Sequence, residues 1–82
     1  MGHALEPVMR RLIDRLETTL PETEVQHLRS LVDASQPGLA LEWITDAVTQ
    51  RGLTSDPSLR QLLVQLGTQL GIAASIRTRL EG

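Results

Sequence analysis

The chain has 82 residues, with ten acidic side chains against eight basic ones, and Trp43 is its single aromatic residue. This length predicts one domain, residues 1–82. The net charge of −2 argues against a nucleic-acid partner, because such binding depends mostly on cationic contacts to phosphate. Because cysteine is absent, the chemistry of disulfides and thiolates is excluded.

Residues that favour helix, leucine above all, dominate the composition, and their spacing predicts an all-α fold. The first predicted helix covers residues 4–19, because apolar residues recur on one side at 100° per residue. Pro21 ends this pattern, since the residue before a proline avoids the helical region, and it suits the first turn of a second helix over 21–34. The apolar residues of these two helices are Leu5, Val8, Met9, Leu12, Ile13, Leu16, Leu20, Val25, Leu28, Leu31 and Val32.

Pro37 and Gly38 predict a turn before the third helix, with the glycine free to take a positive φ. That helix covers 38–51, and Gly52 suits its left-handed C-cap. Asp56 is the expected N-cap of a fourth helix over 57–70, with Pro57 as its first residue.

Gly71 is expected to end the fourth helix, because continuing the rotation would put Arg77 in the middle of a leucine stripe. A short fifth helix over 73–80 then has an apolar side of its own. The spacing Gly67-x-x-x-Gly71 would also allow another helix to approach closely. Since the loops are short, neighbouring helices are expected to be antiparallel. The prediction is a compact bundle of four helices plus a short C-terminal fifth helix.

No constellation for catalysis stands out, and we expect no enzyme, no cofactor and no metal. Glu24 and His27 form an E-x-x-H pair, which occurs in di-metal carboxylate bundles. Such a site also needs further inward-facing carboxylates, whereas the other acids of this sequence map mostly to the outer sides of the predicted helices. His3 lies close to the start of the sequence. The serines lack a recognisable nucleophile context, and no phosphate-binding glycine loop is present.

The sequence also bears on where the protein is located and on which non-enzymatic functions it could have. No apolar run is long enough for a membrane span, and no signal core is visible, so we expect a cytoplasmic protein without a membrane partner. A helix-turn-helix DNA regulator is an alternative, although its arginines would be dispersed and the net charge of the chain is negative. The outer side of the fourth helix is uncharged, which suits a homo-oligomerising helical adaptor; its residues are Gln61, Val64, Gln65 and Thr68.

Trp43 falls at the edge of the apolar arc of the third helix, next to Glu42 and Asp46. One interpretation is that its ring is buried and closes the bundle, with the N–H turned outward. The other is that its rim belongs to a binding patch, since tryptophan is enriched at interface hot spots and nearby acids would steer a basic partner. Both can hold together.

Residues 20–53, LPETEVQHLRSLVDASQPGLALEWITDAVTQRGL, resemble the central signature of MafI-type immunity proteins of bacterial polymorphic toxin systems. The leucine-rich segment DPSLRQLLVQLGTQLGI is similar as well. The likeness rests on an L-P-x-x-E segment, an acid close to a small-residue turn, and PGLALE. In this sequence these are Leu20-Pro21-Glu22-Thr23-Glu24, Asp33-Ala34-Ser35-Gln36 and Pro37-Gly38-Leu39-Ala40-Leu41-Glu42.

The resemblance implies a non-enzymatic inhibitor that binds a cognate toxin domain, commonly a nuclease, and blocks it without covalent chemistry. Acidic surfaces can imitate phosphate to a basic toxin and speed association. The candidate contacts are Asp33, Glu42, Trp43 and Asp46, and a homodimer is a further possibility for the assembly.

Overall fold

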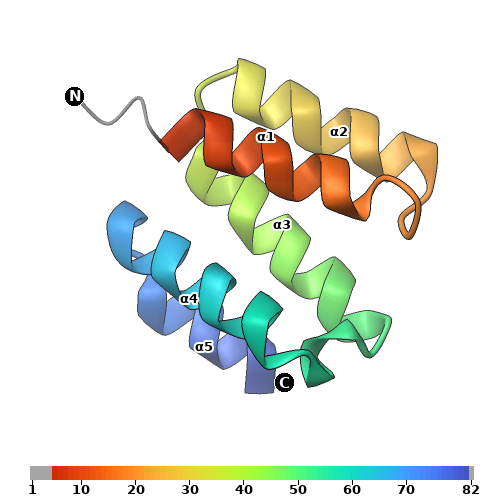
Figure 1. Ribbon diagram of the computed structural model, residues 1–82. Helices are drawn as coiled ribbons and strands as arrows, with labels where there is room; N and C mark the ends of the chain where they lie inside the picture. The colour runs from red at the N-terminus through yellow and green to blue at the C-terminus, as the bar shows by residue number, and fades with distance from the viewer. Residues whose placement is uncertain (1–4, 82) are drawn as a thin grey trace. The chain divides into compact units, whose positions relative to one another are not determined.

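Helices form the fold of residues 5–81, the part of the chain that the computed structural model describes (Figure 1). The α-helices of this range are α1 (Leu5–Leu16), α2 (Glu22–Asp33), α3 (Pro37–Gln50), α4 (Pro57–Leu70) and α5 (Ala73–Glu81). A 3-10 turn, η1 (Leu53–Ser55), precedes α4, and no strand occurs within residues 5–81. The all-α prediction is therefore confirmed. His3 and Ala4, the first residue predicted for the first helix, lie outside the described residues.

The chain divides into two compact units, of which the first ends at Ala40 and the second begins at Leu41. The boundary falls inside α3, so the first turn of this helix belongs to one unit and the rest to the other. The packing of all helices into one bundle and one domain stays a prediction.

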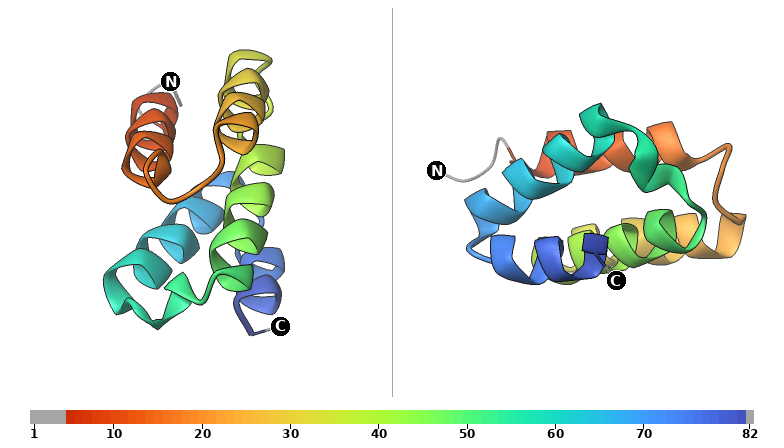
Figure 2. Two further views of the ribbon diagram at one scale, coloured as in Figure 1. Left: turned by 90° about the vertical axis from the view of Figure 1, so that its right-hand side faces the viewer. Right: turned by 90° about the horizontal axis from the view of Figure 1, so that it is seen from below.

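In the first unit, α1 and α2 lie side by side and run antiparallel (Figures 1 and 2). Helix α1 ends at Leu16, earlier than predicted, and the amides of Thr19 and Leu20 both donate to the Leu16 carbonyl, at 3.0 and 2.9 Å. Pro21 restricts the residue before it, which favours this tight ending. The buried apolar residues of this unit include Met9, Leu12, Ile13, Leu16, Leu20, Val25, Leu28 and Val32.

The break between α2 and α3 lies one residue earlier than predicted, at 34–36 instead of 35–37. Ser35, not Gly38, takes the positive φ, at 62°, and Pro37 is already the first residue of α3. The Gln36 amide donates to the Leu31 carbonyl at 2.8 Å, and the Ser35 amide donates to Val32 at 3.0 Å. These are the two hydrogen bonds of a Schellman ending, in which the left-handed residue closes the helix. Proline then suits the first turn of the next helix, where no amide donor is needed.

In the second unit, the predicted signals at both ends of α4 are confirmed. The Asp56 carboxylate accepts a hydrogen bond from the Ser58 amide at 2.9 Å, and Pro57 follows as the first helical residue. At the other end Gly71 has a φ of 77°, and the Ile72 amide donates to the Gly67 carbonyl at 2.8 Å. The turn η1 was not predicted; it follows Gly52, which has the expected positive φ.

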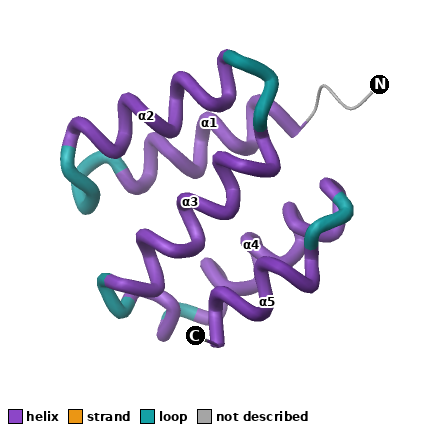
Figure 3. The backbone as a smooth tube through the Cα atoms, turned by 180° about the vertical axis from the view of Figure 1, so that it is seen from behind, coloured by secondary structure: helices purple, strands orange, loops and turns teal. Residues whose placement is uncertain are grey.

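Helices α4 and α5 run antiparallel on the two sides of the Gly71 turn (Figures 2 and 3). They approach closely at Gly67, where an added Cβ would lie only 2.8 Å from Cγ1 of Ile76. The close approach of another helix, which the Gly67-x-x-x-Gly71 spacing suggested, is therefore confirmed at Gly67. The fully or nearly fully buried apolar residues of this unit are Leu41, Ile44, Ala47, Val48, Leu59, Leu63, Leu66, Ile76 and Leu80.

Candidate functional site

Trp43 lies on the outer side of α3, with 48% of its surface exposed. The interpretation in which its ring is buried is therefore wrong, because the apolar arc of α3 is completed without it. Leu39, one helical turn earlier on the same helix, is 44% exposed. Among residues 5–81, these two are the large hydrophobic side chains that the fold leaves exposed. An exposed aromatic side chain on a regular helix is well suited to contact a partner, because the helix fixes its backbone position before binding.

The core side of α3 carries one polar residue, Thr45, which is fully buried. Its hydroxyl donates to the Leu41 carbonyl at 2.8 Å, so the burial leaves no unsatisfied donor. Thr45 was not among the residues predicted to lie in the core. Trp43 is two residues before Thr45 and therefore lies on the opposite, solvent-facing side of α3.

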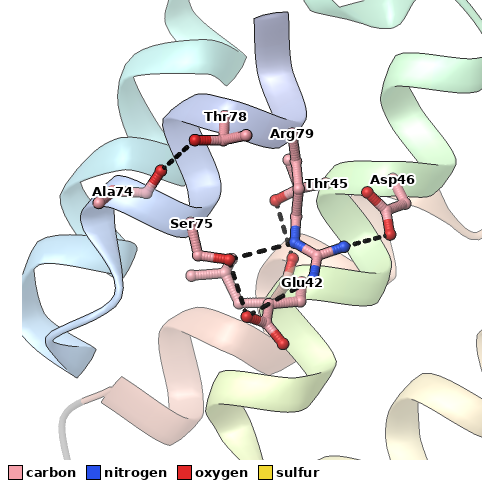
Figure 4. Close-up of polar contacts among 8 residues, drawn as sticks. Glu42, Thr45, Asp46, Ala74, Ser75, Thr78 and Arg79 are labelled. Atoms are coloured by element: carbon pink, nitrogen blue, oxygen red, sulfur yellow. Dashed lines mark hydrogen bonds and ion pairs between the residues drawn. The ribbon is translucent and has the colours of Figure 1, made fainter. Parts of the chain in front are cut away.

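Arg79 of α5 links the two acids that flank Trp43 in the sequence (Figure 4). Its Nη1 donates to Oδ2 of Asp46 at 2.6 Å, and its Nη2 lies 3.7 Å from Oε2 of Glu42. The Arg79 Nε also donates to the Ser75 hydroxyl at 3.2 Å, and that hydroxyl donates to Oε2 of Glu42 at 2.9 Å. Because Glu42 and Asp46 are four residues apart, both carboxylates reach one guanidinium. We call Glu42, Trp43, Asp46, Ser75 and Arg79 the Trp43 surface.

The Trp43 surface is less acidic than the sequence suggested. Two carboxylates and one guanidinium leave a single net negative charge, so long-range steering of a basic partner is weakened. The carboxylates also differ in access, because the Asp46 side chain is 44% exposed and that of Glu42 is 26% exposed. Asp46 is therefore the acid of this surface that a partner's donor can reach more readily.

Asp33, the remaining predicted contact, belongs to the first unit. Its Oδ1 accepts from Nη2 of Arg10 at 2.5 Å, and the same nitrogen donates to Oε1 of Glu6 at 2.8 Å. The hydrogen bonds that Arg10 donates to Asp33 and Glu6 raise the pKa of its guanidinium above the ordinary value. Asp33 thus closes an ion pair between α1 and α2, while Glu42, Trp43 and Asp46 share one surface of the second unit.

Residues 5–81 hold neither a candidate metal site nor a membrane-spanning helix. No group of three or more metal-ligating side chains from residues 5–81 is placed to hold a metal, and Glu24 and His27 of the E-x-x-H pair gain no such companions. No helix in this range is both long and apolar enough to cross a membrane.

Sequence reasoning missed Ser75 and Arg79 as members of the site. They lie 33 residues after Glu42 and Asp46, respectively, and only the fold of the second unit brings them together. A signal was nevertheless present, because Ser75 and Arg79 are four residues apart on α5 just as Glu42 and Asp46 are on α3. This spacing shows only that each pair shares one side of its own helix; it does not show that the two pairs meet.

Comparison of the chain with protein-family models, curated proteins and solved structures gives no match.

Proposed function

We propose that the protein is an immunity protein that binds a cognate bacterial polymorphic toxin domain through the Trp43 surface and blocks it non-covalently. The observation that carries this proposal is the exposure of Trp43 on α3. Residues 20–53, which resemble MafI-type immunity proteins, include α2, α3 and this tryptophan. The segment that suggests the family and the side chain best suited to bind a protein therefore coincide.

In the proposed complex, Trp43 is the anchor that enters a pocket of the toxin. A buried tryptophan contributes a large apolar area, and such anchors account for much of the binding energy in protein interfaces. The ion pairs around Arg79 form a polar rim whose geometry is fixed in the free protein. Asp46 accepts a hydrogen bond from a cationic group of the toxin, which adds specificity and a faster encounter.

Co-expression tests this proposal. The toxic domain is taken from the gene adjacent to that of this chain and is expressed in bacteria with or without the chain. We expect the chain to restore growth. If the toxin kills equally in both cultures, the immunity proposal fails.

The second candidate is a homo-oligomerising helical adaptor. It is favoured by the same exposed Leu39 and Trp43, since large apolar side chains at a surface also suit contact with a second copy. Light scattering separates the two proposals. A monomer at working concentration supports the inhibitor, whereas a stable oligomer that Trp43→Ala dissociates supports the adaptor.

A further inference from the structure

A second surface of the same unit has a different chemistry. Helices α4 and α5 border a groove of about 410 Å³. Its apolar floor includes Val64 and Leu80, and its walls carry the exposed side chains of Arg60 and Arg77. Because Arg77 and Arg79 are two residues apart on α5, they point to different sides of that helix, so this groove is separate from the Trp43 surface.

The two arginines of the groove differ from the arginines that link helices. Within residues 5–81, neither the Arg60 nor the Arg77 side chain has a carboxylate within ion-pair distance. Glu81 lines the same groove and forms no ion pair with either arginine. By contrast, three other arginines each contact two carboxylates, namely Arg10, Arg29 and Arg79. Among the residues that the structure describes, the groove therefore presents two guanidinium groups without a carboxylate partner.

We propose that the α4–α5 groove binds an acidic segment of a partner protein. Guanidinium groups recognise carboxylates by paired N–H donors, and Arg60 and Arg77 can each hold one acidic side chain. The Gln61 and Gln65 side chains, which also line the groove, add amide donors for a peptide backbone or a carboxylate. The apolar floor accommodates an aliphatic residue between the acids. This inference is independent of the proposed toxin inhibition.

Charge favours an acidic protein segment over a nucleic acid. Nucleic-acid affinity grows with the number of phosphates that are neutralised, and this groove offers two cations. Glu81 at the groove and the net charge of −2 would both repel a continuous row of phosphates. A peptide with two carboxylates spaced to meet Arg60 and Arg77 meets less of this repulsion, because it brings fewer negative charges close to Glu81.

An NMR titration of the isotope-labelled full chain tests the proposal. The probe is a short peptide rich in glutamate and leucine, and the control is the same peptide with glutamine in place of glutamate. We expect the first peptide to shift the Nε–H signals of Arg60 and Arg77 in a saturable way and the second to leave them nearly unchanged. In the double variant Arg60→Gln/Arg77→Gln, the affinity should fall about tenfold, or about 1.4 kcal/mol. The matched control Arg11→Gln/Arg15→Gln removes two exposed arginines of α1 and should leave the affinity for the acidic peptide unchanged.

Several results would overturn the proposal. One is that the two peptides produce equal shifts. Another is that the signals of Arg11 and Arg15 move as much as those of the groove arginines. Equal affinity of the groove variant and the unmodified chain would have the same meaning. A single-stranded DNA oligonucleotide that bound the groove arginines more tightly than the acidic peptide would show that the groove is a nucleic-acid site instead.

Discussion

The close approach of α5 to α4 depends on the missing side chain of Gly67. In Gly67→Ala, the new Cβ would lie 2.8 Å from Cγ1 of Ile76 and 3.2 Å from Cα of Ala73. The first atom belongs to a fully buried β-branched side chain and the second to the backbone, so neither moves away easily. Overpacking of this kind costs about 1–3 kcal/mol. Alanine recovers about 1 kcal/mol through its higher helix propensity.

The net expectation for Gly67→Ala is a loss of about 1 kcal/mol in the free energy of unfolding. Urea unfolding followed by far-UV circular dichroism measures it. The corresponding fall in Tm is about 4–8 °C for a domain of this size. Gln69→Ala, at an exposed position of the same helix, is the matched control and should change stability by less than about 0.5 kcal/mol. If Gly67→Ala instead raised stability by the propensity gain alone, α5 would not pack against Gly67.

Three further substitutions test local features by the same unfolding measurement. Ser35→Gly should raise the free energy of unfolding by about 1 kcal/mol, because glycine adopts the positive φ of 62° without steric cost; no gain would contradict the left-handed helix ending. Asp56→Ala should lower it by about 1 kcal/mol through loss of the N-cap, while Asp56→Asn should retain most of the cap; equal stability of both variants would argue against capping. Trp43→Ala should cost less than about 2 kcal/mol, whereas a loss of about 3–5 kcal/mol would indicate a buried ring.

The helices and most of their ends could be predicted because their signals are local. Asp56 and Pro57 start α4, and Gly71 ends it. Both helix caps depend only on residues that are close in the sequence. The turn after α2 was misplaced because a serine holds the left-handed conformation. A positive φ is uncommon in residues other than glycine, so the residue types alone pointed to Gly38, whereas the Schellman hydrogen bonds place Ser35 there.

The arrangement of side chains at the Trp43 surface was predicted only in part, for a different reason. Periodicity placed Glu42, Trp43 and Asp46 together on one side of a helix, as the structure has them. Periodicity could not show that Arg79 forms ion pairs with both carboxylates, since this pairing depends on how α5 packs in the second unit. For the same reason, the engagement of Asp33 by Arg10 was not visible from the sequence.

The most direct test of the proposed function is a calorimetric titration of the neighbouring toxin domain with the unmodified chain and with Trp43→Ala. Truncation of a central aromatic anchor costs about 2 kcal/mol or more, so we expect the affinity of the variant to fall at least about thirtyfold. Thr68→Ala, an exposed change on α4, should bind like the unmodified chain. Equal affinity of Trp43→Ala and the unmodified chain would show that the toxin does not bind at the Trp43 surface.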